Sequence, residues 1–212
     1  MNVRKAAVAI GASLALLSGC GGGTGEAPSL DAKQTVATLP DAKSVPGWEV
    51  SLEPVAYSLK KALSMGVGRC YGEAPDSCAR VRFLGVSAFH QQGKPDLSFI
   101  VQTYKDSATA KSAYRAVWKG WKGRVPSSRP VNVGEVGEQR DAVAGLSASM
   151  AKDSKGTLVQ VRVGSVIMLS MAESVPRIEM ADSFLTKFAT VFAQRADQVQ
   201  EGKTPTAGLR GV

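Results

Sequence analysis

The sequence predicts an α+β fold: one antiparallel sheet of about five to seven strands, with two main helices packed on one face, in a single domain. Short, partly alternating apolar runs recur between turn residues, which is typical of strands in hairpins. Two longer segments repeat apolar residues every three or four positions, as amphipathic helices do. Because short turns can join only antiparallel strands, the helices are expected to form a second layer on the sheet.

The first half of the domain predicts three strands and a helix. Residues 47–59 are expected to form an edge strand, because Pro54 cannot donate a hydrogen bond in a central ladder. Residues 80–90 and 96–104 predict a hairpin joined by the turn-rich QQGKPD. A helix follows over residues 105–124, where Asp106 or Ser107 can cap its start.

The second half predicts more strands and a closing helix. Residues 131–143 indicate a short strand that bends at its glycines. Residues 145–172 predict a three-stranded meander, divided by the loop KDSKG and by the pair Gly164-Ser165. The last helix is predicted by apolar residues three or four apart: Ile178, Ala181, Leu185, Phe188 and Phe192.

The N-terminus has the pattern of a secretory signal. Arg4 and Lys5 precede an apolar run over residues 6–17, which is too short to span a bilayer. Leu17-Ser18-Gly19-Cys20 resembles the lipobox of bacterial lipoproteins. This resemblance implies cleavage before Cys20, diacylglycerol on its sulfur and acylation, for example with palmitate, of the new N-terminus. The alternative is an ordinary signal peptide with an incidental cysteine.

These patterns divide the chain into four parts. Residues 1–19 are the expected lipoprotein signal peptide and residues 20–44 a lipidated flexible linker, since they lack apolar periodicity. Residues 45–198 are the expected α+β domain, and residues 199–212 a disordered tail. The expected location is the extracytoplasmic face of the cell membrane, with the lipid at Cys20 as the anchor.

The two remaining cysteines, Cys70 and Cys78, are expected to form a disulfide bond, because disulfides persist outside the cytoplasm. The turn-rich segment between them could close a small loop. With His90, the only histidine, they do not make a convincing zinc site. We therefore expect neither a metal nor a cofactor.

The net charge of +8 favours anionic partners such as lipid headgroups or wall polymers, and no nucleic acid is expected outside the membrane. Basic residues cluster on the first long helix, between aromatic residues that share one of its faces. The cluster could contact anionic lipid, but docking of the aromatic face on the sheet is favoured, with the basic residues in solvent. They are Lys111, Arg115, Lys119, Lys122 and Arg124.

No catalytic motif is convincing, and the chain is not expected to be an enzyme. His90 lies at a strand end beside a turn, where an inert histidine is the simpler interpretation. Ser58 with Lys61, and Ser149 with Lys152, have the spacing of serine–lysine acyltransferases. The Ser-Asp-Asn and Lys-Thr-Gly strings of those enzymes do not follow.

The lipobox, LPDAKSVPGW, the cysteine pair, the helix SATAKSAYRAVWKGW, the strands LVQVRVGSVIMLS and the closing helix resemble actinobacterial lipoproteins with an extracellular sensor-like domain. These are similar to the periplasmic sensor of a mycobacterial receptor Ser/Thr kinase. The resemblance implies a cleft for an unidentified ligand, although this chain has one cysteine pair where that sensor has two. Two hypotheses follow: a non-catalytic binding or sensor-like module, or a structural lipoprotein that presents a basic face. A pocket with aromatic and convergent polar groups favours the first.

Overall fold

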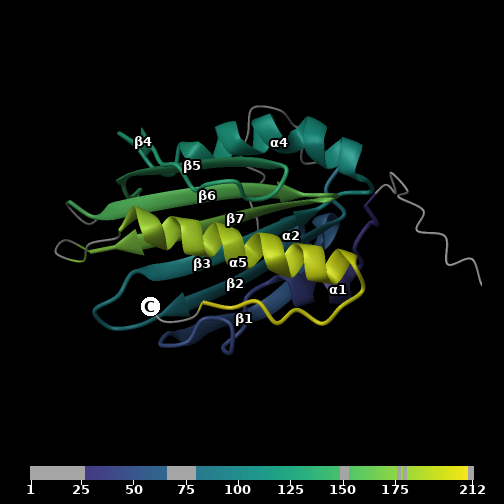
Figure 1. The fold of residues 1–212 in the computed structure, drawn as a ribbon, viewed down its shortest axis with the longest axis horizontal. Helices are drawn as coiled ribbons and strands as arrows, with labels where there is room; N and C mark the ends of the chain where they lie inside the picture. Colours follow the sequence, from purple (N-terminus) through teal and green to yellow (C-terminus); the bar gives the residue numbers. More distant parts are fainter. Residues whose placement is uncertain (1–26, 66–79, 149–152, 176–177, 179–180, 210–212) are drawn as a thin grey trace, which may run out of the picture.

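The computed structural model describes residues 27–65, 80–148, 153–175, 178 and 181–209 (Figure 1). The predicted signal peptide over residues 1–19 lies outside the described residues, as do Cys20, Cys70, Cys78, Ser149 and Lys152. The expected lipid attachment and disulfide bond therefore stay predictions. Within the described part of the chain, no helix is long and apolar enough to cross a membrane.

The core of the fold is one seven-stranded antiparallel sheet with the order β1-β2-β3-β7-β6-β5-β4. This confirms the predicted α+β class, the antiparallel sheet and the number of strands. The predicted hairpin is β2 and β3, and β1 lies at an edge as Pro54 required. The strands are β1 (Glu49–Ser58), β2 (Phe83–His90), β3 (Asp96–Thr103), β4 (Arg129–Pro130), β5 (Gln139–Leu146), β6 (Lys155–Val163) and β7 (Val166–Ser174).

The two main helices, α4 (Ser107–Lys122) and α5 (Asp182–Gln200), pack on opposite faces of the sheet. The prediction that both lie on one face is wrong. The reason lies in β6 and β7, which are buried along nearly their whole length, although β6 includes polar Gln160 and Arg162. Because neighbouring residues in a strand point to opposite faces, Val159 packs toward α5 and Leu158 toward α4. Such strands need a covering layer on each side.

The short helix α1 (Ala32–Thr38) extends the domain toward the N-terminus. Asp31 and Gln34 form a capping box at its start, and Leu39 just after it is buried. Gly85 of β2 lets α1 lie close to the sheet, since a Cβ there would meet Leu39 and Thr35 at 3.1 Å. The predicted linker over residues 20–44 is therefore wrong for residues 30–44, whose structure belongs to the domain.

A second short helix, α2 (Leu59–Ser64), follows β1 directly. Ser58 caps it, accepting a hydrogen bond from the backbone N–H of Lys61 at 3.4 Å. The Nζ atom of Lys61 lies over the Tyr57 ring, 5.3 Å from its centroid. Ser58 and Lys61 thus have structural contacts as a helix cap and a cation–π pair.

The C-terminal segment turns back along α5, and Leu209 is buried in the core. Its N–H donates to the Ser44 carbonyl at 2.7 Å. The buried Arg195 guanidinium donates at 2.7–3.2 Å to carbonyls at the end of α1 and in the C-terminal segment: those of Ala37, Thr38, Leu39 and Ala207. The expected disorder from residue 199 is therefore wrong for residues 199–209.

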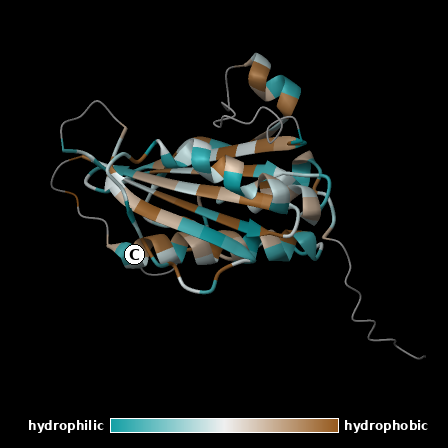
Figure 2. Cartoon of the chain, turned by 90° about the horizontal axis from the view of Figure 1, so that it is seen from above, coloured by the Kyte–Doolittle hydropathy of each residue, from teal (hydrophilic) through white to brown (hydrophobic). Residues whose placement is uncertain are grey.

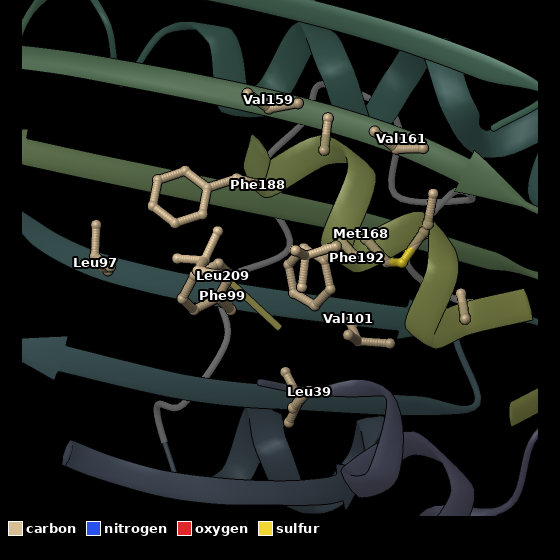
Figure 3. Close-up of a cluster of buried hydrophobic side chains, with 14 of the residues drawn as sticks. Leu39, Leu97, Phe99, Val101, Val159, Val161, Met168, Phe188, Phe192 and Leu209 are labelled. Atoms are coloured by element: carbon tan, nitrogen blue, oxygen red, sulfur yellow. The ribbon is translucent and has the colours of Figure 1, made fainter. Parts of the chain in front are cut away.

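The core on the α5 face is centred on Phe99 (Figure 3). Its ring makes edge contacts with Phe89, Phe188 and Phe192, with centroids 5.0–5.8 Å apart. Figure 2 shows apolar residues along the strands between the layers. This face is closed by α5, α1 and the C-terminal segment together.

Candidate ligand site

A cleft of about 260 Å³ lies on the α4 face, where the C-terminal end of α4 meets the sheet. It combines an aromatic side chain, two apolar residues and three charged side chains, so that apolar and polar parts of one small molecule could both find contacts there. Its volume suits a compact ligand. The lining residues are Asp96, Ser98, Ile100, Trp121, Arg124, Met171 and Glu173.

The floor of the cleft follows from strand geometry. Asp96, Ser98 and Ile100 occupy alternate positions of β3, so their side chains share one face. The register of β3 against β7 places Glu173 directly opposite Asp96 and Met171 opposite Ser98. The strand pairing therefore brings two carboxylates together at one end of an apolar floor.

Two carboxylates directly opposite each other in an antiparallel pair destabilise it unless a positive charge lies near. The Asp96 carboxylate contacts the Nδ1 atom of His90, and both side chains are largely exposed. Among the described residues, Glu173 has no ion-pair partner closer than 4.0 Å. The pair can accept a cationic group from a ligand.

The helical wall consists of Trp121 and Arg124. Trp121, on the apolar face of α4, is buried, as the sequence predicted for the aromatic residues of this helix. Arg124 follows the helix and is only half-exposed. Of the five basic residues predicted as one surface cluster, Arg124 alone lines the cleft, and the other four are exposed on α4.

Two reciprocal hydrogen bonds fix α4 on the sheet. The Tyr114 hydroxyl donates to the Gln160 carbonyl at 3.1 Å, and Gln160 Nε2 donates to the Tyr114 carbonyl at 2.9 Å. Burial raises the pKa of Tyr114 above its usual range, and the nearby Asp141 carboxylate acts in the same direction. The phenol therefore stays neutral. The two hydrogen bonds hold α4, which contributes Trp121 to the cleft, at a fixed position on the sheet.

Beyond the cleft, the α4 face continues over β2 and β1. Val86 and Ala88 are opposite Ile100 and Ser98 and are half-buried, while Leu52 of β1 is 44% exposed. The strands that α4 contacts are β5, β6 and β7. The cleft thus opens onto a partly apolar shelf instead of a closed interior.

Two other hollows are larger but chemically less suited to a small ligand. A groove of about 410 Å³ follows α5 and the C-terminal segment, and a hollow of about 420 Å³ lies beside β4 to β6. The first has no aromatic lining residue. In the second, Arg129 is already held by both oxygens of Asp182, at 2.8 and 2.9 Å.

The part of the chain that the structure describes offers few residues for metal binding or nucleophilic catalysis. No group of three His, Cys, Asp or Glu side chains there could hold a metal ion. The His90 imidazole is bonded to Asp96, and no described serine donates to it. The sequence analysis did not single out Asp96, Ser98 or Glu173, because only the β3–β7 pairing brings them together.

Comparison with known proteins gives a likeness in fold to a solved structure. No family model and no curated protein matches the sequence. A solved structure, the extracellular domain of PknH from Mycobacterium tuberculosis, is similar to it with a TM-score of 0.55 and 10% identity. The match covers 82% of this chain and 99% of that domain. At this identity the likeness shows the fold alone.

Proposed function

We propose that this chain is a lipid-anchored, extracytoplasmic, sensor-like binding module whose ligand occupies the cleft between α4 and the sheet. The observation that carries the proposal is the cleft itself, with Trp121 above Ile100 and with Asp96 opposite Glu173. The likeness in fold to an extracellular domain supports the setting. The lipobox at Cys20 supports the anchor.

The proposed ligand is a compact organic amine with an apolar portion. An ammonium group would bridge the Asp96 and Glu173 carboxylates through charge-assisted hydrogen bonds. The apolar portion would lie on Ile100 and Met171 beneath Trp121. Binding would place a further positive charge beside the two carboxylates, in addition to the Arg124 guanidinium that lines the same cleft. The proposal includes no catalytic step.

The test is native mass spectrometry of the protein purified from its own host, together with thermal unfolding in the presence of putrescine as a probe amine. We expect a retained small molecule, and a rise in melting temperature with putrescine. The double variant D96N/E173Q should lose both. The control variant E201Q removes an exposed carboxylate after α5 and should retain both. Equal behaviour of the two variants would refute the cleft as the site.

A second candidate function is supported by the exposed basic residues of α4. Lys111, Lys119 and Lys122 lie on its solvent side, away from buried Tyr114 and Trp121. Such a stripe could hold a structural lipoprotein against anionic wall polymer or a membrane complex. Co-sedimentation with purified cell wall that is lost in K111Q/K119Q, but kept in D96N/E173Q, would favour this function.

A further inference from the structure

The N-terminal segment joins the domain at the end of the sheet opposite the ligand cleft. Ser29 Oγ donates to the Tyr104 carbonyl at 3.1 Å, and Ser165 Oγ donates to the Pro28 carbonyl at 2.7 Å. Tyr104 follows β3, whereas Asp96 begins it. The cleft therefore opens at the far end of β3 from the point where the described chain begins.

The chain between a lipid on Cys20 and this point is short. The described residues begin at Ala27, seven positions after Cys20. A fully extended chain of seven residues spans at most about 25 Å. A lipid on Cys20 would therefore keep this end of the sheet within that distance of the bilayer.

The surface beside Ser29 is basic and partly apolar. The Arg82 side chain donates a hydrogen bond to Ser29 Oγ. The backbone carbonyl of Arg82 accepts a hydrogen bond at 3.2 Å from the N–H of Leu59, the first residue of α2. On α2 and just after it, Leu63 and Met65 are 52% and 50% exposed. We call this surface the anchor-side patch; it consists of Lys60, Lys61, Leu63, Met65 and Arg82.

Acidic side chains do not cancel the charge of this patch. In the described part of the chain, neither Lys60 nor Lys61 forms an ion pair. The nearby carboxylates of Asp31 and Asp106 cap α1 and α4, and each accepts a backbone N–H at 2.6–2.7 Å. Basic residues beside exposed apolar side chains fit a surface of anionic lipid headgroups.

We infer that the anchor-side patch docks on anionic phospholipid of the membrane that holds the lipid, so that the domain stands upright with its ligand cleft directed away. This inference rests on the proposed anchor at Cys20. The competing orientation lays α4 flat on the bilayer through Lys111 and Lys119. The two orientations use different lysines, so variants can separate them.

The first experiment measures hydrogen exchange of the mature lipidated chain, reconstituted into vesicles of phosphatidylcholine with or without phosphatidylglycerol. We expect slower exchange of the α2 amides only in the anionic vesicles. The variant K60Q/K61Q should lose this protection, and K111Q/K119Q should keep it. Equal exchange of α2 in both kinds of vesicle, or loss of protection only in K111Q/K119Q, would overturn the inference.

The second experiment removes the lipid, so that failure of the anchor and failure of the patch are distinguishable. The mature chain with Cys20→Ser is sedimented with anionic vesicles. Substitution K60Q/K61Q should lower its partition about 25-fold, since each lysine near the surface contributes about fivefold. An unchanged partition overturns the patch, whereas an intact mass of the native full chain that shows no lipid on Cys20 overturns the anchor alone.

Discussion

The two faces of the sheet are covered to very different extents. On the α5 face, α5, α1 and the C-terminal segment close over a core in which Phe99 is 2% exposed. On the α4 face, α4 packs over β5, β6 and β7, and the next residue of β3, Ile100, is only half-buried at the edge of the cleft. Two adjacent residues of one strand thus belong to different environments.

This difference separates stability from binding. The larger of the two buried apolar clusters lies on the α5 face, so most of the stabilising burial is on that side of the sheet. On the same face, Arg195 holds the end of α1 and the C-terminal segment by hydrogen bonds. On the α4 face, the cover given by helix α4 stops near Trp121. The charged side chains of Asp96 and Glu173 beyond it line a cleft. A domain with one closed and one open face can bind a ligand without opening its main core.

The largest predicted effect breaks the closed face. Phe99→Ala should lower the free energy of unfolding by about 3–5 kcal/mol, because a fully buried aromatic ring with three aromatic neighbours is lost. Ile100→Ala should cost about 1–2 kcal/mol, since that side chain is only partly buried. Urea unfolding followed by circular dichroism measures both. Equal losses would show that the faces do not differ as described.

Local patterns predicted most elements of the fold, because they depend on neighbours in sequence. The hairpin of β2 and β3, the Asp106 cap of α4 and the turn at Gly164-Ser165 all follow from nearby residues. The placement of helices on the two faces did not, because it requires β6 and β7 to be central. The nearly continuous apolar run from Val166 to Ala172 in β7 was the sequence signal that could have indicated two covering layers.

The candidate site was less predictable than the fold. Asp96 and Glu173 are 77 positions apart in sequence, and only the non-local β3–β7 register places them opposite each other. Arg124 was predicted as part of a surface cluster, yet it follows the end of α4 and lines the cleft. α1 was missed because a seven-residue helix has little periodicity, and its stability comes from packing over Gly85.

The second largest predicted effect is on the end of α1 and the C-terminal segment, which cover the α5 face and are held there by Arg195. Arg195→Met should cost about 3 kcal/mol, because buried carbonyls at the end of α1 and in the C-terminal segment lose their donor. Hydrogen exchange should rise first at the Leu209 N–H, which bonds to Ser44. Gln194→Met, at an exposed neighbouring position of α5, is the control and should change neither quantity. Stability retained in R195M would mean that apolar packing alone holds the segments.

The smallest predicted effect concerns the hydrogen bond that fixes α4. Tyr114→Phe should cost about 1 kcal/mol, because the Gln160 carbonyl loses a donor while the ring remains in place. Tyr114 also predicts a pH dependence, since burial raises its pKa in the folded protein above that of an unfolded tyrosine, about 10.

The sign of this dependence follows from proton binding. Above pH ~10 the unfolded chain loses the phenol proton while the folded protein keeps it, so stability falls as pH rises. Denaturant unfolding at a series of alkaline pH values should show a shallower decline for Y114F than for the native sequence. Some decline should remain, because burial also raises the pKa of Tyr104. Identical slopes in the two proteins would mean that the Tyr114 phenol is ionised as readily on the α4 face as in the unfolded chain, and hence that burial does not raise its pKa.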